Sequence, residues 1–121
     1  MESLRVLIIE DDALSAQDVE MMLNNIGHSC CGIVADGRVA VEKAMEERPD
    51  IVLMDISLKG GSDGIEAAEQ IYNRLNIPVV YISGYSDKET LSQVKETNPY
   101  GFKVKPIEEE NLWRTLELAV Y

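Results

Sequence analysis

Polar side chains that could do chemistry follow four apolar runs of this sequence. Asp55 follows the run 51–54 and opens a glycine-bearing segment. The others follow runs that end near residues 9, 82 and 104, and they are Glu10 with Asp11, Ser83, and Lys105. A carboxylate at the carboxyl end of a buried strand lies where open α/β sheets place their ligands. The set could bind a divalent cation and carry a phosphoryl group on Asp55.

This chemistry depends on the combination. Carboxylates held close together repel one another, and a hard divalent cation relieves that repulsion. Mg²⁺ fits best because it prefers oxygen ligands and retains several waters, and Mn²⁺ is expected to substitute for it. Asp55 can then attack phosphorus as a nucleophile and form an acyl phosphate. Lys105 would neutralise the oxygens of the transferring group, and Ser83 would donate a hydrogen bond to one of them.

Each of these residues also has a structural alternative. An acidic residue after a strand often only caps the next helix, and Asp12 suits that role as well as it suits the site. A single serine such as Ser83 commonly only forms a turn. Lys105 could be a plain surface lysine. The occurrence of all of them at four strand ends of one sheet favours a shared site.

Length and composition indicate one globular domain over residues 1–121. Hydrophobic residues make up 45% of the chain, which is too many for disorder. No stretch approaches the roughly 20 apolar residues that cross a bilayer, and we find no signal peptide, so we expect a cytoplasmic protein. The net charge of −11 opposes nucleic-acid binding and favours cations and basic partner surfaces.

Periodicity predicts alternating strands and helices. The expected strands lie near residues 4–9, 29–35, 51–54, 79–82 and 100–104. One helix follows each strand: the first ends at Gly27 and the second before Pro49. The third carries Ile71, the fourth begins with a capping box at Ser86, and the last follows Pro106.

Strict alternation of this kind implies a parallel sheet covered by helices on both faces. The first, third and fourth strands are nearly unbroken apolar runs, which is typical of central strands. The second and fifth carry polar residues or glycine and suit the edges. These features predict a flavodoxin-like (βα)5, doubly wound sheet with strand order 2-1-3-4-5.

Three further residue types need an interpretation. Neighbouring Cys30 and Cys31 point to opposite faces of a strand, so a disulfide between them would be strained, and we expect one buried and one outward thiol. His28, the only histidine, is expected to be a loop residue. Trp113 is expected to pack partly in the core.

The site residues also match a family pattern. The chain resembles, over its whole length, the receiver domain of two-component response regulators. The matching pieces are residues 8–12, Met54-Asp55 with Asp63-Gly64, Ile82-Ser83-Gly84, and Lys105-Pro106. The resemblance implies that Asp55 accepts phosphate from a phosphohistidine on a sensor histidine kinase or phosphotransfer protein. It implies no enzymatic activity beyond the chain's own phosphorylation and dephosphorylation.

The resemblance also assigns the supporting roles. Glu10 and Asp11 form the acidic pair, with Asp11 the more direct Mg²⁺ ligand, and the backbone carbonyl of Ser57 completes the protein ligands. Lys105 contacts the phosphoryl group.

A switch and an interaction face follow from the same resemblance. Ser83 and Phe102 form the switch pair, in which the hydroxyl moves toward the phosphate and the ring turns inward. Receivers dimerise or signal through the face made by the fourth helix, fifth strand and fifth helix, where Trp113 is an alternative anchor.

Three rival functions share this fold or chemistry. A pseudo-receiver would bind partners without phosphorylation, but such domains usually lose an acidic residue or the lysine. An Mg²⁺-dependent phosphohydrolase of the haloacid-dehalogenase type usually has a second Asp where this chain has Ser57. A flavodoxin would need a first loop that accepts phosphate, whereas the acidic loop 10–12 would repel it.

Overall fold

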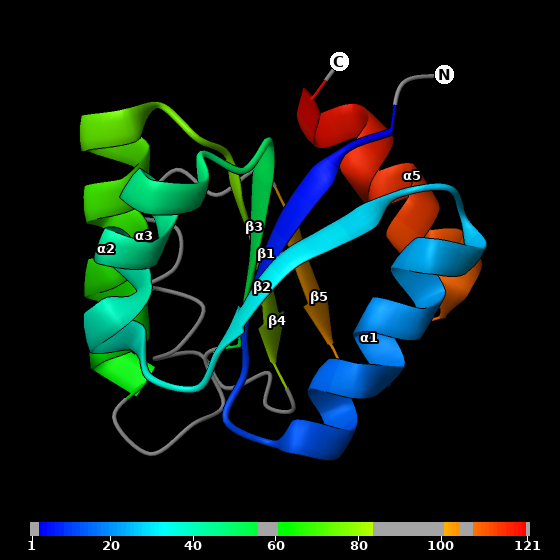
Figure 1. Ribbon diagram of the computed structural model, residues 1–121, viewed down its shortest axis with the longest axis horizontal. Helices are drawn as coiled ribbons and strands as arrows, with labels where there is room; N and C mark the ends of the chain where they lie inside the picture. Colours follow the sequence, from blue (N-terminus) through cyan, green and yellow to red (C-terminus); the bar gives the residue numbers. More distant parts are fainter. Residues whose placement is uncertain (1–2, 56–60, 84–100, 105–107, 121) are drawn as a thin grey trace.

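A computed structural model of the chain describes residues 3–55, 61–83, 101–104 and 108–120. A parallel sheet forms its centre, with helices on both faces (Figure 1). None of the helices within these ranges is both long enough and apolar enough to cross a membrane.

The strands run side by side in an order different from their order in the chain. They are β1 (Arg5–Ile9), β2 (Ser29–Val34), β3 (Ile51–Asp55), β4 (Val79–Ser83) and β5 (Gly101–Val104). Their spatial order is β2-β1-β3-β4-β5, and every neighbouring pair is parallel. The predicted α/β class and parallel sheet are therefore confirmed, as is the order 2-1-3-4.

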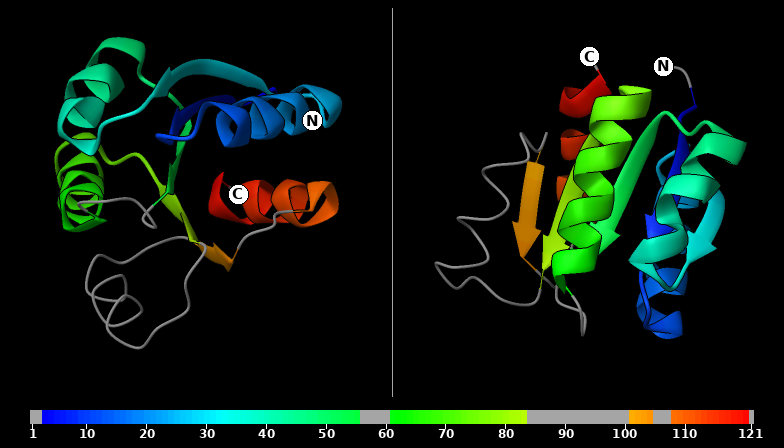
Figure 2. Two further views of the ribbon diagram at one scale, coloured as in Figure 1. Left: turned by 90° about the horizontal axis from the view of Figure 1, so that it is seen from below. Right: turned by 90° about the vertical axis from the view of Figure 1, so that its left-hand side faces the viewer.

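Helices cover the two faces in pairs. They are α1 (Ala13–Asn25), α2 (Ala40–Glu47), preceded by the short 3-10 helix η1 (Gly37–Val39), α3 (Gly61–Leu75) and α5 (Glu109–Val120). Viewed along the sheet, α1 and α5 lie side by side on one face, and α2 and α3 lie on the other (Figure 2). The helix predicted to begin near Ser86 lies outside the described residues.

Two apolar clusters, one on each face, explain this arrangement. Leu7, Val52 and Tyr81 pack under α2 and α3, whereas Val6, Leu53 and Leu116 pack between the sheet and the helices α1 and α5. All five residues of β3 are buried, as expected for a strand covered on both faces. Burying each large side chain stabilises the fold by roughly 1.5–3 kcal/mol.

The exposure of the two cysteines of β2 differs from the expectation. Cys30 and Cys31 do point to opposite faces and are free thiols, but both are partly buried. Cys30 packs against the cluster under α1, and Cys31 packs against the one under α2. The prediction of one outward thiol was wrong because helices cover this edge strand on both sides. Burial raises the pKa of both thiols, which keeps them protonated.

Two other residues differ from expectation in their surroundings. Trp113, which was expected to pack partly in the core, is 41% exposed on α5 and belongs to neither apolar cluster. The apolar residues of α5 that face the sheet are Leu112, Leu116 and Ala119, and this stripe does not include position 113. His28 lies in the turn before β2 as expected, but its side chain is buried.

Candidate functional site

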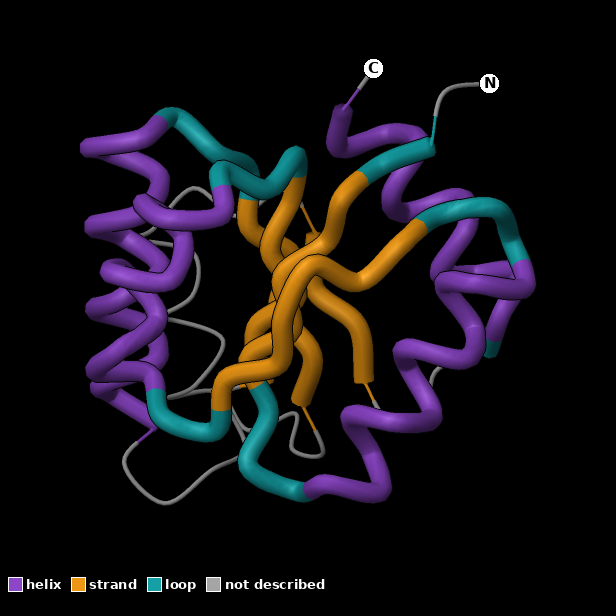
Figure 3. The backbone as a smooth tube through the Cα atoms, viewed as in Figure 1, coloured by secondary structure: helices purple, strands orange, loops and turns teal. Residues whose placement is uncertain are grey.

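The strand register brings the predicted site positions to one edge of the sheet. Ile9 of β1 is level with Met54 of β3, so the next residues, Glu10 and Asp55, lie at the same height. Asp55 is in turn level with Ile82 of β4. The loop from β1 into α1 lies at this carboxyl edge, at the bottom of the view in Figure 3.

Asp55 and Glu10 are both buried. Asp55, the last residue of the central strand β3, is 2% exposed, and Glu10 is 6% exposed. Two carboxylates withdrawn from water at neighbouring strand ends are costly unless positive charge or hydrogen bonds compensate them. Their placement therefore indicates a site that attracts cationic groups.

Hydrogen bonds fix the position of Glu10. Its backbone N–H donates to the carbonyl oxygen of Val34 at 2.8 Å, which extends the pairing of β1 with β2 by one residue. Its Oε2 accepts a hydrogen bond from the backbone N–H of Asp12 at 3.3 Å. The longer Glu side chain thus folds back onto its own loop.

The structure separates the roles of the two following acidic residues. Asp12 is the N-cap of α1, and its Oδ1 accepts from the backbone N–H groups of Leu14 (2.9 Å) and Ser15 (3.3 Å). Asp11 makes no such cap and is exposed beside the sheet edge. Of the two alternatives for Asp12, the capping role is therefore the one that the structure supports.

The remaining predicted site residues are described only in part. Ser83 ends β4 and is level with Val104 of β5, and Phe102 is level with Tyr81. For these two positions only the backbone is described. Ser57 and Lys105 lie outside the described residues.

The donor atoms at this edge suit Mg²⁺. Within the described ranges, no group of three His, Cys, Asp or Glu side chains is gathered to hold a metal ion. Mg²⁺ does not need such a cage, because it usually takes one or two carboxylates and keeps waters in its other positions. The buried carboxylates of Glu10 and Asp55, with exposed Asp11 beside them, match that requirement.

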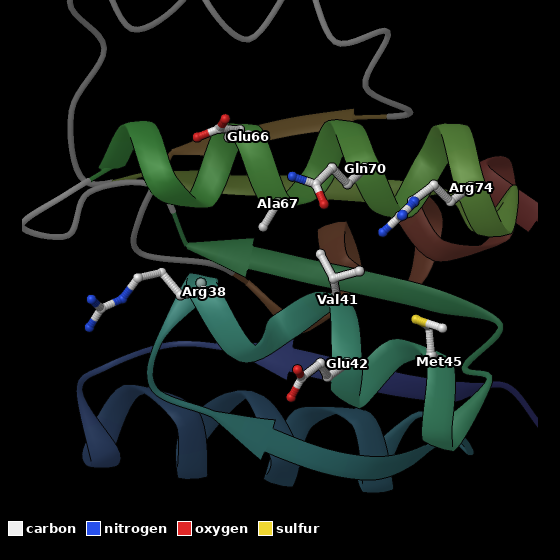
Figure 4. A pocket seen from close by; sticks show the side chains of 9 residues that line it. Arg38, Val41, Glu42, Met45, Glu66, Ala67, Gln70 and Arg74 are labelled. Atoms are coloured by element: carbon white, nitrogen blue, oxygen red, sulfur yellow. The ribbon is translucent and has the colours of Figure 1, made fainter.

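A separate hollow lies between α2 and α3. Its volume is about 580 Å³, and Val41 and Ala67 form part of its lining, with Arg38, Glu66 and Arg74 around them (Figure 4). Glu10, Asp11 and Asp55, the predicted site residues whose side chains are described, do not line it. These three carboxylates lie at the sheet edge and not in this hollow.

Comparison with known proteins agrees with this geometry. The family model described as the response regulator receiver domain matches residues 6–117. The chain belongs to this family. The receiver is 35% identical over 116 residues to the transcriptional regulatory protein PdtaR of Mycobacterium tuberculosis, covering 96% of this chain and 56% of that protein. It is 31% identical to the phyllosphere-induced regulator PhyR of Methylorubrum extorquens, covering 96% and 43%.

Solved receiver structures share the fold. The signal receiver domain of a modulated diguanylate cyclase from Desulfovibrio desulfuricans superposes with a TM-score of 0.92, at 36% identity, covering 98% of this chain and 94% of that one. The receiver domain of a sensor histidine kinase from Pseudomonas aeruginosa has a TM-score of 0.85 at 25% identity, covering 98% of both chains. That structure has a magnesium ion coordinated in its active site cleft.

These comparisons establish the class of protein. The chain is a receiver domain of a two-component system, and it spans about half the length of the curated relatives it matches. Receivers are generally not enzymes that turn over a substrate.

Proposed function

We propose that Asp55 is the phosphoryl acceptor of this receiver. The observation that carries the proposal is its position: a buried carboxylate at the end of the central strand, level with a second buried carboxylate. One Asp55 carboxylate oxygen attacks phosphorus of a phosphohistidine, the P–N bond breaks, and the imidazole leaves with a proton. The product is an acyl phosphate on Asp55. A sensor histidine kinase or a phosphotransfer protein supplies the phosphohistidine.

Glu10, Asp11, Asp55 and the backbone carbonyl of Ser57 would hold the metal. Asp11 would be the more direct ligand, while Glu10, whose Oε2 accepts a hydrogen bond from the Asp12 N–H, would act through water. Bound Mg²⁺, or Mn²⁺ in its place, supplies positive charge that reduces repulsion between Asp55 and the incoming phosphoryl group. The magnesium in the Pseudomonas receiver supports this assignment.

Lys105, Ser83 and Phe102 complete the proposed machinery. Lys105 neutralises a phosphoryl oxygen, and the Ser83 hydroxyl donates a hydrogen bond to another. When Ser83 moves toward the phosphate, the ring of Phe102 turns inward behind it. The paired backbones of β4 and β5 support the coupling, because they hold Ser83 and Phe102 on adjacent strands.

The finer features of the protein belong to the same proposal. Residues 1–121 form one flavodoxin-like (βα)5 domain, with its fourth helix in the segment 84–100 and β5 at the edge. The domain works in the cytoplasm, does not bind nucleic acid, and catalyses only its own phosphorylation and dephosphorylation. A homodimer would use the face made by the fourth helix, β5 and α5, where the exposed Trp113 is available as an anchor.

Intact mass spectrometry with Mg²⁺ and acetyl phosphate tests the acceptor. We expect one acid-stable, base-labile phosphoryl adduct that requires Mg²⁺ and is absent from Asp55→Asn. Asp50→Asn is the matched control, because Asp50 is an exposed aspartate just before the same strand and accepts from the Arg5 N–H. This variant should be phosphorylated like the parent chain.

An adduct that persists in Asp55→Asn would place the acceptor elsewhere. If folded protein takes no phosphate from acetyl phosphate or from a phosphohistidine donor, the chain is a pseudo-receiver. Steady release of phosphate from small esters over many turnovers would instead indicate a phosphohydrolase.

A further inference from the structure

A buried polar pair lies at the end of the sheet opposite to Asp55. His28, the only histidine of the chain, is 3% exposed in the turn between α1 and β2. Its backbone N–H donates to the carbonyl oxygen of Leu23 at 2.9 Å, so the turn holds it firmly. In Figure 1 this turn lies at the upper right, beside α5.

The hydrogen bond to Leu4 determines the tautomer of His28. The backbone N–H of Leu4 donates to His28 Nδ1 at 3.0 Å in a buried setting. Nδ1 therefore carries no proton, and a neutral imidazole must carry its proton on Nε2. Nε2 is buried and has no hydrogen-bond partner in the structure, so its N–H is an unsatisfied donor.

A matching acceptor lies on α5. Glu117 Oε1 is also buried without a partner, and these two are the only such side-chain atoms among the described residues. Glu117 belongs to α5, which packs beside α1, the helix that leads into the His28 turn. Leu4, Leu23 and Leu116, neighbours of the pair, belong to one apolar cluster.

We propose that the His28 Nε2–H and the Glu117 carboxylate are joined through one buried water molecule and so form a clamp that holds α5 against the sheet. A buried donor and a buried acceptor are each costly when left alone, and pairing them removes both costs. A single internal water with polar partners on both sides would do the same. The clamp lies away from the phosphoryl site and is independent of the proposed acceptor.

The neighbouring charged groups are engaged elsewhere. Arg5 of β1 forms an ion pair with Glu47, and Glu20 of α1 acts on Cys30. Among the charged groups of the described residues, Glu117 is the one that acts on the pKa of His28, and it opposes the larger lowering caused by burial.

The clamp is expected to weaken in acid. Burial lowers the pKa of His28, and Glu117 offsets part of that change. A second proton could enter only at Nδ1, where it would break the bond to the Leu4 N–H. As pH falls through about 6.5, the unfolded chain binds a proton before the folded one does, so the free energy of unfolding decreases.

NMR of the imidazole nitrogens tests the clamp, since the chain has one histidine and its signals need no assignment. We expect the Nε2–H tautomer and a pKa below the ordinary value. Glu117→Gln should lower that pKa further, by roughly half a unit or more, because it removes the nearby negative charge. Glu110→Gln, the same change at an exposed position of α5, should leave it unchanged.

Two outcomes would overturn the clamp. One is an Nδ1–H tautomer in the parent chain, which can be read without any variant. The other is a His28 pKa that is the same in the parent chain and in Glu117→Gln. His28→Asn offers a second check, because the amide oxygen of Asn can accept from the Leu4 N–H while the Nε2–H donor is lost. The free energy of unfolding of this variant should not decrease between pH 7 and pH 5 as that of the parent chain does.

Discussion

The three consecutive acidic residues after β1 have three different environments. Glu10 is buried and bonded to its own loop, Asp11 is exposed, and Asp12 caps α1. The positions of Asp55 and Glu10 at one sheet edge could be predicted from the sequence, because parallel strands align their carboxyl ends. The different roles of Glu10, Asp11 and Asp12 could not be predicted, since they depend on how the chain turns after Ile9.

Asp12→Ala should therefore affect stability rather than phosphorylation. Loss of the cap leaves the N–H groups of Leu14 and Ser15 without their acceptor, at a cost of about 1 kcal/mol in the free energy of unfolding. Urea denaturation measures this cost, and Asp12→Asn should retain most of the stability. If the Asp12→Ala protein kept its stability but failed to accept phosphate, Asp12 would be assigned to the phosphorylation site and not to the cap of α1.

At the scale of elements, periodicity predicted α1, α3 and α5 well because their buried stripes follow the helical repeat. Ala16, Val19 and Leu23 of α1 are buried as the spacing required. Periodicity does not show what covers an edge strand or a turn. The burial of His28 and the partial burial of the thiol expected to face outward were therefore missed, since they depend on contacts with distant helices.

Gly27, just before the edge strand β2, and Gly32, within it, should respond differently to substitution by alanine. Gly27, which follows α1, has a φ of +91°, and alanine there is strained even though space is open. At Gly32 in β2, a Cβ would lie 3.0 Å from the Cε of Lys43, a flexible side chain that can move aside. We expect Gly27→Ala to destabilise the protein by about 1 kcal/mol.

Gly32→Ala is the matched comparison, and we expect it to be neutral or slightly stabilising, by up to about 0.5 kcal/mol, because a strand interior disfavours glycine. Thermal or urea unfolding of both variants measures the difference. A larger loss at Gly32 than at Gly27 would mean that the stem of Lys43 is rigidly packed over β2.

At the scale of the whole molecule, the net charge of −11 makes folding sensitive to salt. Compaction brings like charges together, and any cation that screens them raises the free energy of unfolding. A specific metal site would add a contribution that general screening does not supply. Ligand linkage gives about 1.4 kcal/mol at ten times the dissociation constant.

MgCl₂ should therefore raise the unfolding temperature more than NaCl does at equal ionic strength. The excess should disappear in Asp11→Asn, which loses the proposed direct ligand, and persist in Asp18→Asn, an exposed aspartate of α1. Equal effects of the two salts on the parent chain would contradict a specific site. A persistent excess in Asp11→Asn would assign the metal to other ligands.

The strand order also bears on how the chain can assemble during synthesis. The first three strands to emerge from a ribosome, β1, β2 and β3, are immediate neighbours in the finished sheet. The later strands β4 and β5 join one after the other at the free side of β3, and neither is inserted between strands already paired. The sheet can therefore grow in the direction of translation without reopening a formed ladder, and Asp55 receives its second flanking strand only when β4 arrives.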